Sequence, residues 1–169
     1  MFKETIDKKS YLFYKNIYDD SYGINLDFNT LFKLYSESEE ELESLIRSKF
    51  PPAANNVLSK VYQIRNINNS RFNKLLNELR QQTKKQFNYE YITCDSFFSF
   101  KNTSGNVHQD YEHVCIIGCY GTTYYNFPDY QSQVKIQKGD MLFIPRGLKH
   151  NVLSPDPRII LSVGFYVNK

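Results

Sequence analysis

The chain has 169 residues, 41% of them hydrophobic and 23% charged, and its 21 basic and 18 acidic residues leave a net charge of +3. This length suits one domain around one core, and only 7 glycines and no tryptophan argue against a repeat or low-complexity protein. The net charge is too small to predict a nucleic-acid partner, and no apolar run approaches the ~20 residues of a membrane span.

The start of the chain and its cysteines indicate the compartment. Met1 to Glu4 lack the apolar stretch of a secretory signal, so we expect a cytoplasmic protein. The three cysteines do not make a disulfide framework. Cys115 and Cys119 lie four residues apart in an apolar run, which differs from the spacing of a metal knuckle. We therefore expect Cys94, Cys115 and Cys119 to be buried, reduced and dispensable for metal binding.

The first predicted elements are a strand and a short helix. Residues 11–18 are rich in aromatic and aliphatic side chains and favour a strand. Asn29 or Thr30 is predicted to cap a short helix that continues through Leu34.

A longer helix is predicted over residues 36–50. Ser38 precedes Glu41 by three residues, which is the spacing of a capping box, and Pro51-Pro52 would end the helix. Its predicted apolar face consists of Leu42, Leu45 and Ile46.

A second long helix is predicted over residues 71–86, with Ser70 as its cap. Its apolar stripe consists of Phe72, Leu75, Leu76 and Leu79. For both long helices, packing against the rest of the domain explains the apolar face without a further function.

Near residue 87 the period of the apolar residues changes from about 3.6 to 2, which indicates strands. Another strand is predicted to begin at His150. The remaining strands, separated by turn signals, are predicted at 95–100, 107–110, 114–119, 122–127, 133–136, 141–144 and 159–167. We expect a mainly β domain over 1–169, a barrel in 87–169 with a cover of helices in 1–86.

Two short motifs carry the candidate chemistry. In His108-Gln109-Asp110 the histidine and the acid are two residues apart, so both point to one face of a strand. His150 follows 40 residues later, after the turn Pro145-Arg146-Gly147. Two imidazoles and a carboxylate on neighbouring strands can occupy one face of an octahedral metal and leave three positions open. The sequence therefore predicts one divalent metal, Fe(II), at His108, Asp110 and His150.

The chain resembles the cupin-fold oxygenases of the JmjC-like class, and within it the ribosomal-protein hydroxylases. Three blocks carry the resemblance, residues 105–121, 138–150 and 161–165, and residues 10–34 are similar to the opening strand and helix of the family. The resemblance implies a double-stranded β-helix, or jelly-roll barrel. It also implies an enzyme that uses Fe(II), 2-oxoglutarate and oxygen to hydroxylate a side chain, with metal ligands at His108, Asp110 and His150.

One position departs from the family pattern. The family usually places a Lys or Arg thirteen residues after the metal-binding Asp, where it binds the distal carboxylate of 2-oxoglutarate, and here that position is Thr123. A hydroxyl cannot form the charge-assisted pair. Arg158, which opens the last strand, is the best substitute for this cation. The alternative is that Arg158 is only a solvated turn residue. Tyr125 shares a strand face with Thr123 and could add a hydroxyl, or could simply fill the barrel.

These observations predict an Fe(II)- and 2-oxoglutarate-dependent oxygenase that acts on a peptide or protein side chain or on a small metabolite. Strand alternation points His113 away from the barrel interior, so we do not expect it to bind the metal. Two alternatives stay open, a metal cupin enzyme that does not use 2-oxoglutarate and a cupin-like binding or regulatory protein without turnover. The sequence predicts neither a nucleic-acid nor a membrane partner, and the substrate and the oligomeric state do not follow from it.

Overall fold

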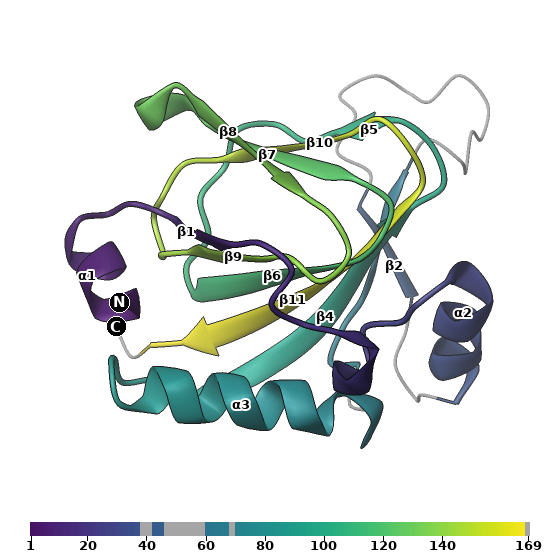
Figure 1. Ribbon diagram of the computed structural model, residues 1–169. Helices are drawn as coiled ribbons and strands as arrows, with labels where there is room; N and C mark the ends of the chain where they lie inside the picture. The colour runs from purple at the N-terminus through teal and green to yellow at the C-terminus, as the bar shows by residue number, and fades with distance from the viewer. Residues whose placement is uncertain (38–41, 46–59, 68–69, 168–169) are drawn as a thin grey trace.

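The computed structural model describes residues 1–37, 42–45, 60–67 and 70–167, and in these two antiparallel sheets face one another (Figure 1). The larger sheet has seven strands, in the order β1 (Leu12–Tyr14), β9 (Met141–Ile144), β6 (His113–Tyr120), β11 (Arg158–Tyr166), β4 (Tyr91–Ser99), β3 (Val61–Ile64) and β2 (Leu42–Leu45). The smaller sheet has four strands, in the order β5 (Thr103–Ser104), β10 (Asn151–Ser154), β7 (Thr123–Phe127) and β8 (Ser132–Ile136). The predicted mainly β jelly roll is confirmed.

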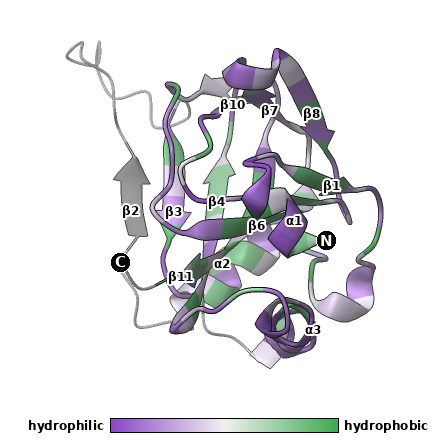
Figure 2. Ribbon diagram, turned by 90° about the vertical axis from the view of Figure 1, so that its left-hand side faces the viewer, coloured by the Kyte–Doolittle hydropathy of each residue, from purple (hydrophilic) through white to green (hydrophobic). Residues whose placement is uncertain are grey.

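The α-helices cover the outer face of the larger sheet. The α-helices are α1 (Phe2–Asp7), α2 (Phe28–Ser36) and α3 (Asn73–Lys84), and the 3-10 helices are η1 (Asp20–Tyr22), η3 (Ser70–Phe72) and η4 (Pro128–Tyr130). Helix α3 runs beneath β4 and β11 in Figure 1. In Figure 2, which views α3 nearly end-on, most of this helix is hydrophilic, whereas β1 is mostly hydrophobic. The few apolar residues of α3, which are Leu75, Leu76 and Leu79, are buried against the sheet.

Alternation along the strands of the larger sheet creates two hydrophobic cores. The inner core lies between the sheets and includes Val114 and Ile116 of β6, whereas the outer core lies under the helices and includes Cys115 and Ile117. A strand that is covered on both faces presents apolar residues at every position, and all but the last residue of β6 are buried. The site residues that face the inner core are therefore placed inside the barrel.

Several predicted elements differ from the structure. Residues 42–45 form strand β2, paired with β3, so the predicted helix over 36–50 is wrong there, and its residues 38–41 and 46–50 lie outside the described residues. The predicted strand over 107–110 is also wrong, because only an isolated bridge joins His108 to His150.

The predicted helix ends also need correction. Helix α2 is capped by Asp27, whose carboxylate accepts from the Thr30 N–H at 2.7 Å, and not by Asn29 or Thr30. Ser70 opens the 3-10 turn η3, and α3 begins three residues later at Asn73. The alternation from residue 87 becomes a strand only at Tyr91, where β4 begins.

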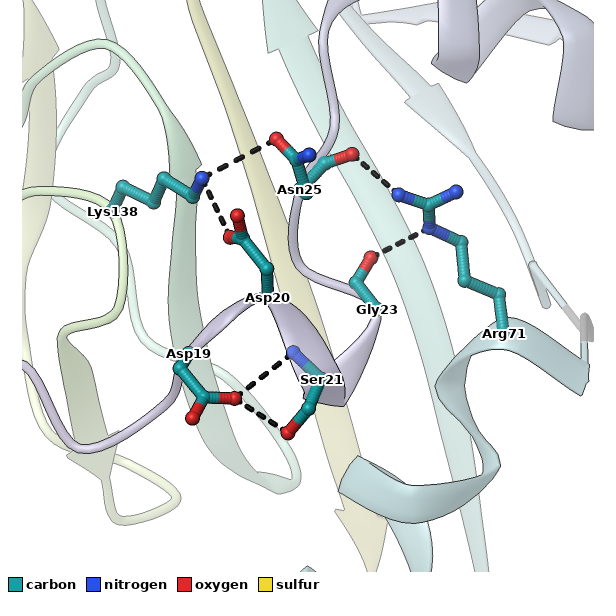
Figure 3. A network of polar contacts seen from close by, with 7 residues as sticks. All are labelled: Asp19, Asp20, Ser21, Gly23, Asn25, Arg71 and Lys138. Carbon is teal, nitrogen blue, oxygen red and sulfur yellow. Dashed lines mark hydrogen bonds and ion pairs between the residues drawn. The ribbon is translucent and has the colours of Figure 1, made fainter.

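A polar network fastens the segment around η1 to the rest of the molecule (Figure 3). Lys138, in the turn between β8 and β9, lies 2.6 Å from Asp20 and donates to the Asn25 side chain at 3.3 Å. Arg71 of η3 donates to the carbonyl oxygens of Gly23 and Asn25. The N-terminal segment is thereby tied both to the barrel and to the start of α3.

No helix among the described residues is long and apolar enough to span a membrane.

Candidate metal centre

Three side chains converge at one end of the inner core. His108, Asp110 and His150 each offer a ligand atom, and these atoms all lie within 4.8 Å of one another. The Nε2 atom of His150 is 3.6 Å from one Asp110 carboxylate oxygen, and the Nε2 atom of His108 is 3.9 Å from the other. Among the described residues this is the only such group of three or more potential ligands.

The orientation of both imidazoles suits metal binding. The Nδ1 atom of His108 is 2.9 Å from the carbonyl oxygen of Asn106, and the Nδ1 atom of His150 is 3.0 Å from that of Leu148. A carbonyl oxygen can only accept, so Nδ1 carries the proton in each ring and the Nε2 lone pair is free. Both free nitrogens face Asp110. Histidine ligands are commonly oriented by a bond of this kind to the other ring nitrogen.

Backbone contacts hold the two ligand-bearing segments together. The N–H of His108 donates to the His150 carbonyl at 2.8 Å, and the reverse bond has the same length. The Gly147 N–H donates to the Asp110 carbonyl at 2.9 Å, and Gly147 has a φ of +78°, which favours glycine in this turn. The backbone bridge and the turn contact, and not the predicted strand, therefore hold the two ligand-bearing segments together.

The three ligands differ in their access to solvent. The His150 side chain is 3% exposed, whereas those of Asp110 and His108 are 26% and 41% exposed. Burial lowers the pKa of His150, and His108 adds to this effect, while the carbonyl of Leu148 and the carboxylate of Asp110 oppose it. The site therefore has one ligand, His150, deep in the barrel and one, His108, that solvent can reach.

A buried cation lies further along the barrel interior. Arg158 is 4% exposed, and its Nη1 atom is 3.5 Å from the Thr123 hydroxyl oxygen. Its Nε atom has no hydrogen-bond partner among the described residues. Burial lowers the pKa of Arg158, and the neighbouring Tyr125 hydroxyl partly offsets this effect. A buried guanidinium with a free donor is costly unless it has an anionic partner.

Tyr125 connects this cation to the metal ligands. Its ring centroid is 6.0 Å from that of His150, and its hydroxyl interacts with Arg158. Burial raises the pKa of Tyr125, so its hydroxyl stays protonated and can donate. The alternation of β7 points Thr123, Tyr125 and Phe127 inward together, and the shared strand face predicted for the first two is confirmed.

A close approach of two turns fixes the position of Arg158. Gly121 has a φ of +70°, and a Cβ built on it would lie 2.1 Å from the Pro157 carbonyl oxygen and 3.2 Å from the Arg158 Cα. The turn between β6 and β7 can therefore approach the start of β11 only with glycine at this position.

The structure also places the residues that the sequence predicted to be outside the site. His113 lies on the outer face of β6, is 4% exposed and is not part of the ligand group. Cys94, Cys115 and Cys119 are free and buried in the outer core, as expected, and burial raises the pKa of each thiol. The orienting carbonyls of Asn106 and Leu148 were not predicted, because no side-chain pattern signals a backbone acceptor.

Comparison with known proteins supports the resemblance drawn from the sequence. Residues 121–169 match the JmjC domain family, a stretch that includes His150 and Arg158 but begins after Asp110. A comparison with curated protein sequences finds no match.

Several solved structures share the fold over the whole chain. The ribosomal oxygenase YcfD from Escherichia coli matches with a TM-score of 0.70 and 18% identity, covering 100% of this chain and 52% of that chain. The same protein in complex with cobalt and 2-oxoglutarate also gives 0.70 and 18%, covering 99% and 52%. Its complex with cobalt and succinic acid gives 0.65 and 17%, with the same coverage. This chain spans about half the length of these structures. The predicted resemblance to JmjC-like cupin oxygenases is confirmed.

Proposed function

We propose that this chain, whose fold and C-terminal sequence resemble those of JmjC-like cupin oxygenases, is an Fe(II)- and 2-oxoglutarate-dependent oxygenase. The observation that carries the proposal is the orientation of the two imidazoles. Both present a free Nε2 to one carboxylate, because both Nδ1 atoms are engaged by carbonyl oxygens. A two-histidine, one-carboxylate set with open positions is typical of non-haem Fe(II) oxygenases.

The donor set fits the metal. His108, Asp110 and His150 would supply two nitrogens and one oxygen, and the His108 side chain is 41% exposed to solvent. Fe(II) held there would supply the redox chemistry that couples oxygen to 2-oxoglutarate. The chain's own contribution is to hold the ligands in place and to keep water out with the inner core around His150.

Arg158 is the proposed partner of 2-oxoglutarate. Its guanidinium is buried, lacks a hydrogen-bond partner for Nε among the described residues, and lies beside Thr123 and Tyr125. In this proposal Arg158 binds the distal carboxylate through a charge-assisted bond, and Thr123 and Tyr125 contribute neutral hydrogen bonds. The cation that the family usually places at position 123 is thereby replaced from the last strand.

The proposed reaction consumes one 2-oxoglutarate and one oxygen molecule. One oxygen atom enters succinate as carbon dioxide is released, and the other replaces a substrate C–H bond by C–OH. The proposed substrate is a side chain of a peptide or protein, in keeping with the description of YcfD as a ribosomal oxygenase. A small metabolite is the alternative.

A second candidate function is a metal cupin enzyme that does not use 2-oxoglutarate. Thr123 favours it, because this neutral residue occupies the position of the usual anchoring cation. In that case the anion that Arg158 binds would belong to another substrate.

The test is the formation of succinate from 2-oxoglutarate by the Fe(II)-loaded protein in air. A slow reaction without the substrate is expected, so succinate can be measured before the substrate is identified. We expect succinate from the wild type and from Asp129→Ala, which changes an exposed acid on η4, but none from Asp110→Ala. A metal-loaded wild type that makes no succinate, with or without a cell extract as a source of substrate, would contradict the proposal. It would favour the second candidate or a binding protein.

A further inference from the structure

A side chain outside the ligand group contacts the turn that carries His150. His113 opens β6, three residues after Asp110, and its Nδ1 atom accepts a hydrogen bond from the Arg146 N–H at 3.1 Å. Arg146 belongs to the turn that begins at Pro145 and leads to His150. The imidazole of His113 therefore joins the segment of one metal ligand to the turn of another.

This hydrogen bond differs in kind from the other hydrogen bonds between the same two segments. The bridge between His108 and His150 and the bond from Gly147 to Asp110 are all made by backbone atoms. The bond from Arg146 to His113 is the one among these contacts that a side chain makes. It is also the one that a substitution can remove while the backbone bonds remain.

The His113 ring is held firmly in the outer core. Its centroid is 5.0 Å from that of Phe87 in an edge-on arrangement, and 5.8 Å from that of Phe143 in a stacked one. Burial, with a smaller contribution from the charge of Arg146, lowers the pKa of His113 to about 4. The ring is therefore neutral near pH 7, and its Nδ1 is available as an acceptor.

We propose that His113 is a positioning residue for the metal centre, which holds the turn of residues 145–148 so that His150 faces Asp110. The inference rests on the proposed function, because it concerns the same three ligands. It assigns no contact between His113 and the metal. The ring acts through the turn, much as residues behind a ligand set the orientation of that ligand in other metal sites.

Two substitutions separate positioning from packing. His113→Phe keeps an aromatic ring against Phe87 and Phe143 but removes the acceptor. His113→Asn removes the ring, but its side-chain oxygen is as many bonds from the backbone as Nδ1 and can accept the same hydrogen bond. A structural role predicts that Asn is the more harmful change, whereas a positioning role predicts that Phe is the more harmful one for the metal.

The experiment is a titration of the metal-free protein with Co(II), followed by the visible absorption of the bound ion, with the thermal midpoint of each variant measured in parallel. We expect His113→Phe to lower the affinity for Co(II) about tenfold or more, which is the range for residues that orient a metal ligand. We also expect this variant to alter the absorption spectrum of the bound ion. We expect His113→Asn to lower the thermal midpoint more, yet to keep the wild-type spectrum and a Kd within about threefold of the wild type.

Three results would overturn the proposal. In the first, His113→Phe binds Co(II) as the wild type does. In the second, both variants lose affinity for Co(II) in proportion to their lost stability. Either result would show that His113 contributes only to packing. A wild type that binds no Co(II) would contradict the metal centre itself and therefore this inference with it. Only that last result bears on the proposed function, so the two failures can be told apart.

Discussion

Arg158 brings a positive charge into the interior of a barrel whose other described lining is largely apolar. From the sequence, Arg158 could be placed at the start of the last strand, but not on the inner or the outer face of that strand. The structure places it inward, beside Thr123 and Tyr125, where its Nε lacks a hydrogen-bond partner among the described residues. Its proposed role as the partner of 2-oxoglutarate follows from this position.

We predict that Arg158→Ala lowers the affinity for 2-oxoglutarate by roughly ten- to a hundredfold. A charge-assisted hydrogen bond contributes about 1.5–3 kcal/mol, and each factor of ten in affinity is about 1.4 kcal/mol. Thr123→Val, the matched control, removes only a neutral bond and should weaken it less. Calorimetric titration of the Mn(II)-loaded proteins measures both effects. Unchanged affinity in Arg158→Ala would assign the carboxylate to another group.

His113 gives the metal-free protein a specific pH dependence. Burial lowers its pKa from 6.5 to about 4, so between these values the unfolded chain binds more protons than the folded one. The contribution of His113 to the free energy of unfolding is therefore complete above pH 6.5. It is lost as the pH falls toward 4, by at most about 1.4 kcal/mol per pH unit. Urea unfolding at pH 7 and pH 5 should show a smaller loss in His113→Phe than in the wild type. Equal losses would mean that His113 is protonated in the folded state.

At the scale of the elements, the sequence was most informative where the pattern has one interpretation. The strands of the barrel from β6 onward lie close to their predicted ranges, because alternation and turn residues agree there. Leu42 and Leu45 were assigned to a helix because three-residue spacing fits one, yet residues 42–45 pair with β3. Pairing between distant segments has no signal in a local pattern, and tertiary contacts override local propensity.

The loop of residues 105–112 shows the same limit within the site. The spacing of His108 and Asp110 predicted that they act together, and their ligand atoms do lie close to each other. The predicted reason, a strand face, was wrong, because a backbone bridge and the bond from Gly147 hold them instead. Side-chain motifs were thus visible in the sequence, whereas the backbone contacts that orient them were not.

The cysteines of β4 and β6 provide a prediction about these strands. Replacing Cys94, Cys115 and Cys119 together with Ala should lower the free energy of unfolding, since all three are buried in the outer core. It should leave Mn(II) binding intact, because the ligands belong to other residues. Denaturant unfolding and metal analysis of the same sample check both parts. A folded triple variant that loses stoichiometric metal would show that a thiol takes part in the site.

At the scale of the whole molecule, the two sheets and the cover of helices have separate roles. The outer core, between α3 and the larger sheet, contributes stability, and the inner core surrounds the candidate centre. A metal that binds only the folded state should stabilise the whole domain. Because the ligands lie at one end of the barrel, their removal should leave the fold in place.

We predict that Mn(II) raises the thermal midpoint of the wild type and of Asp129→Ala, but not that of a variant in which His108 and Asp110 are both replaced with Ala. Stabilisation by a ligand at a hundred times its Kd amounts to about 2.7 kcal/mol, which a thermal scan detects readily. Elemental analysis should find one metal per chain in the first two proteins and none in the third. Full metal content in the double variant would place the site elsewhere.

The central claim is that this chain binds a metal and 2-oxoglutarate at one site. It is tested most directly by calorimetric titration of 2-oxoglutarate into the wild type with and without Mn(II). If 2-oxoglutarate chelates the metal and its distal carboxylate pairs with Arg158, one molecule per chain should bind to the Mn(II)-loaded protein, and binding should be far weaker without the metal. Equal binding in the two titrations, or no binding in either, would contradict the account.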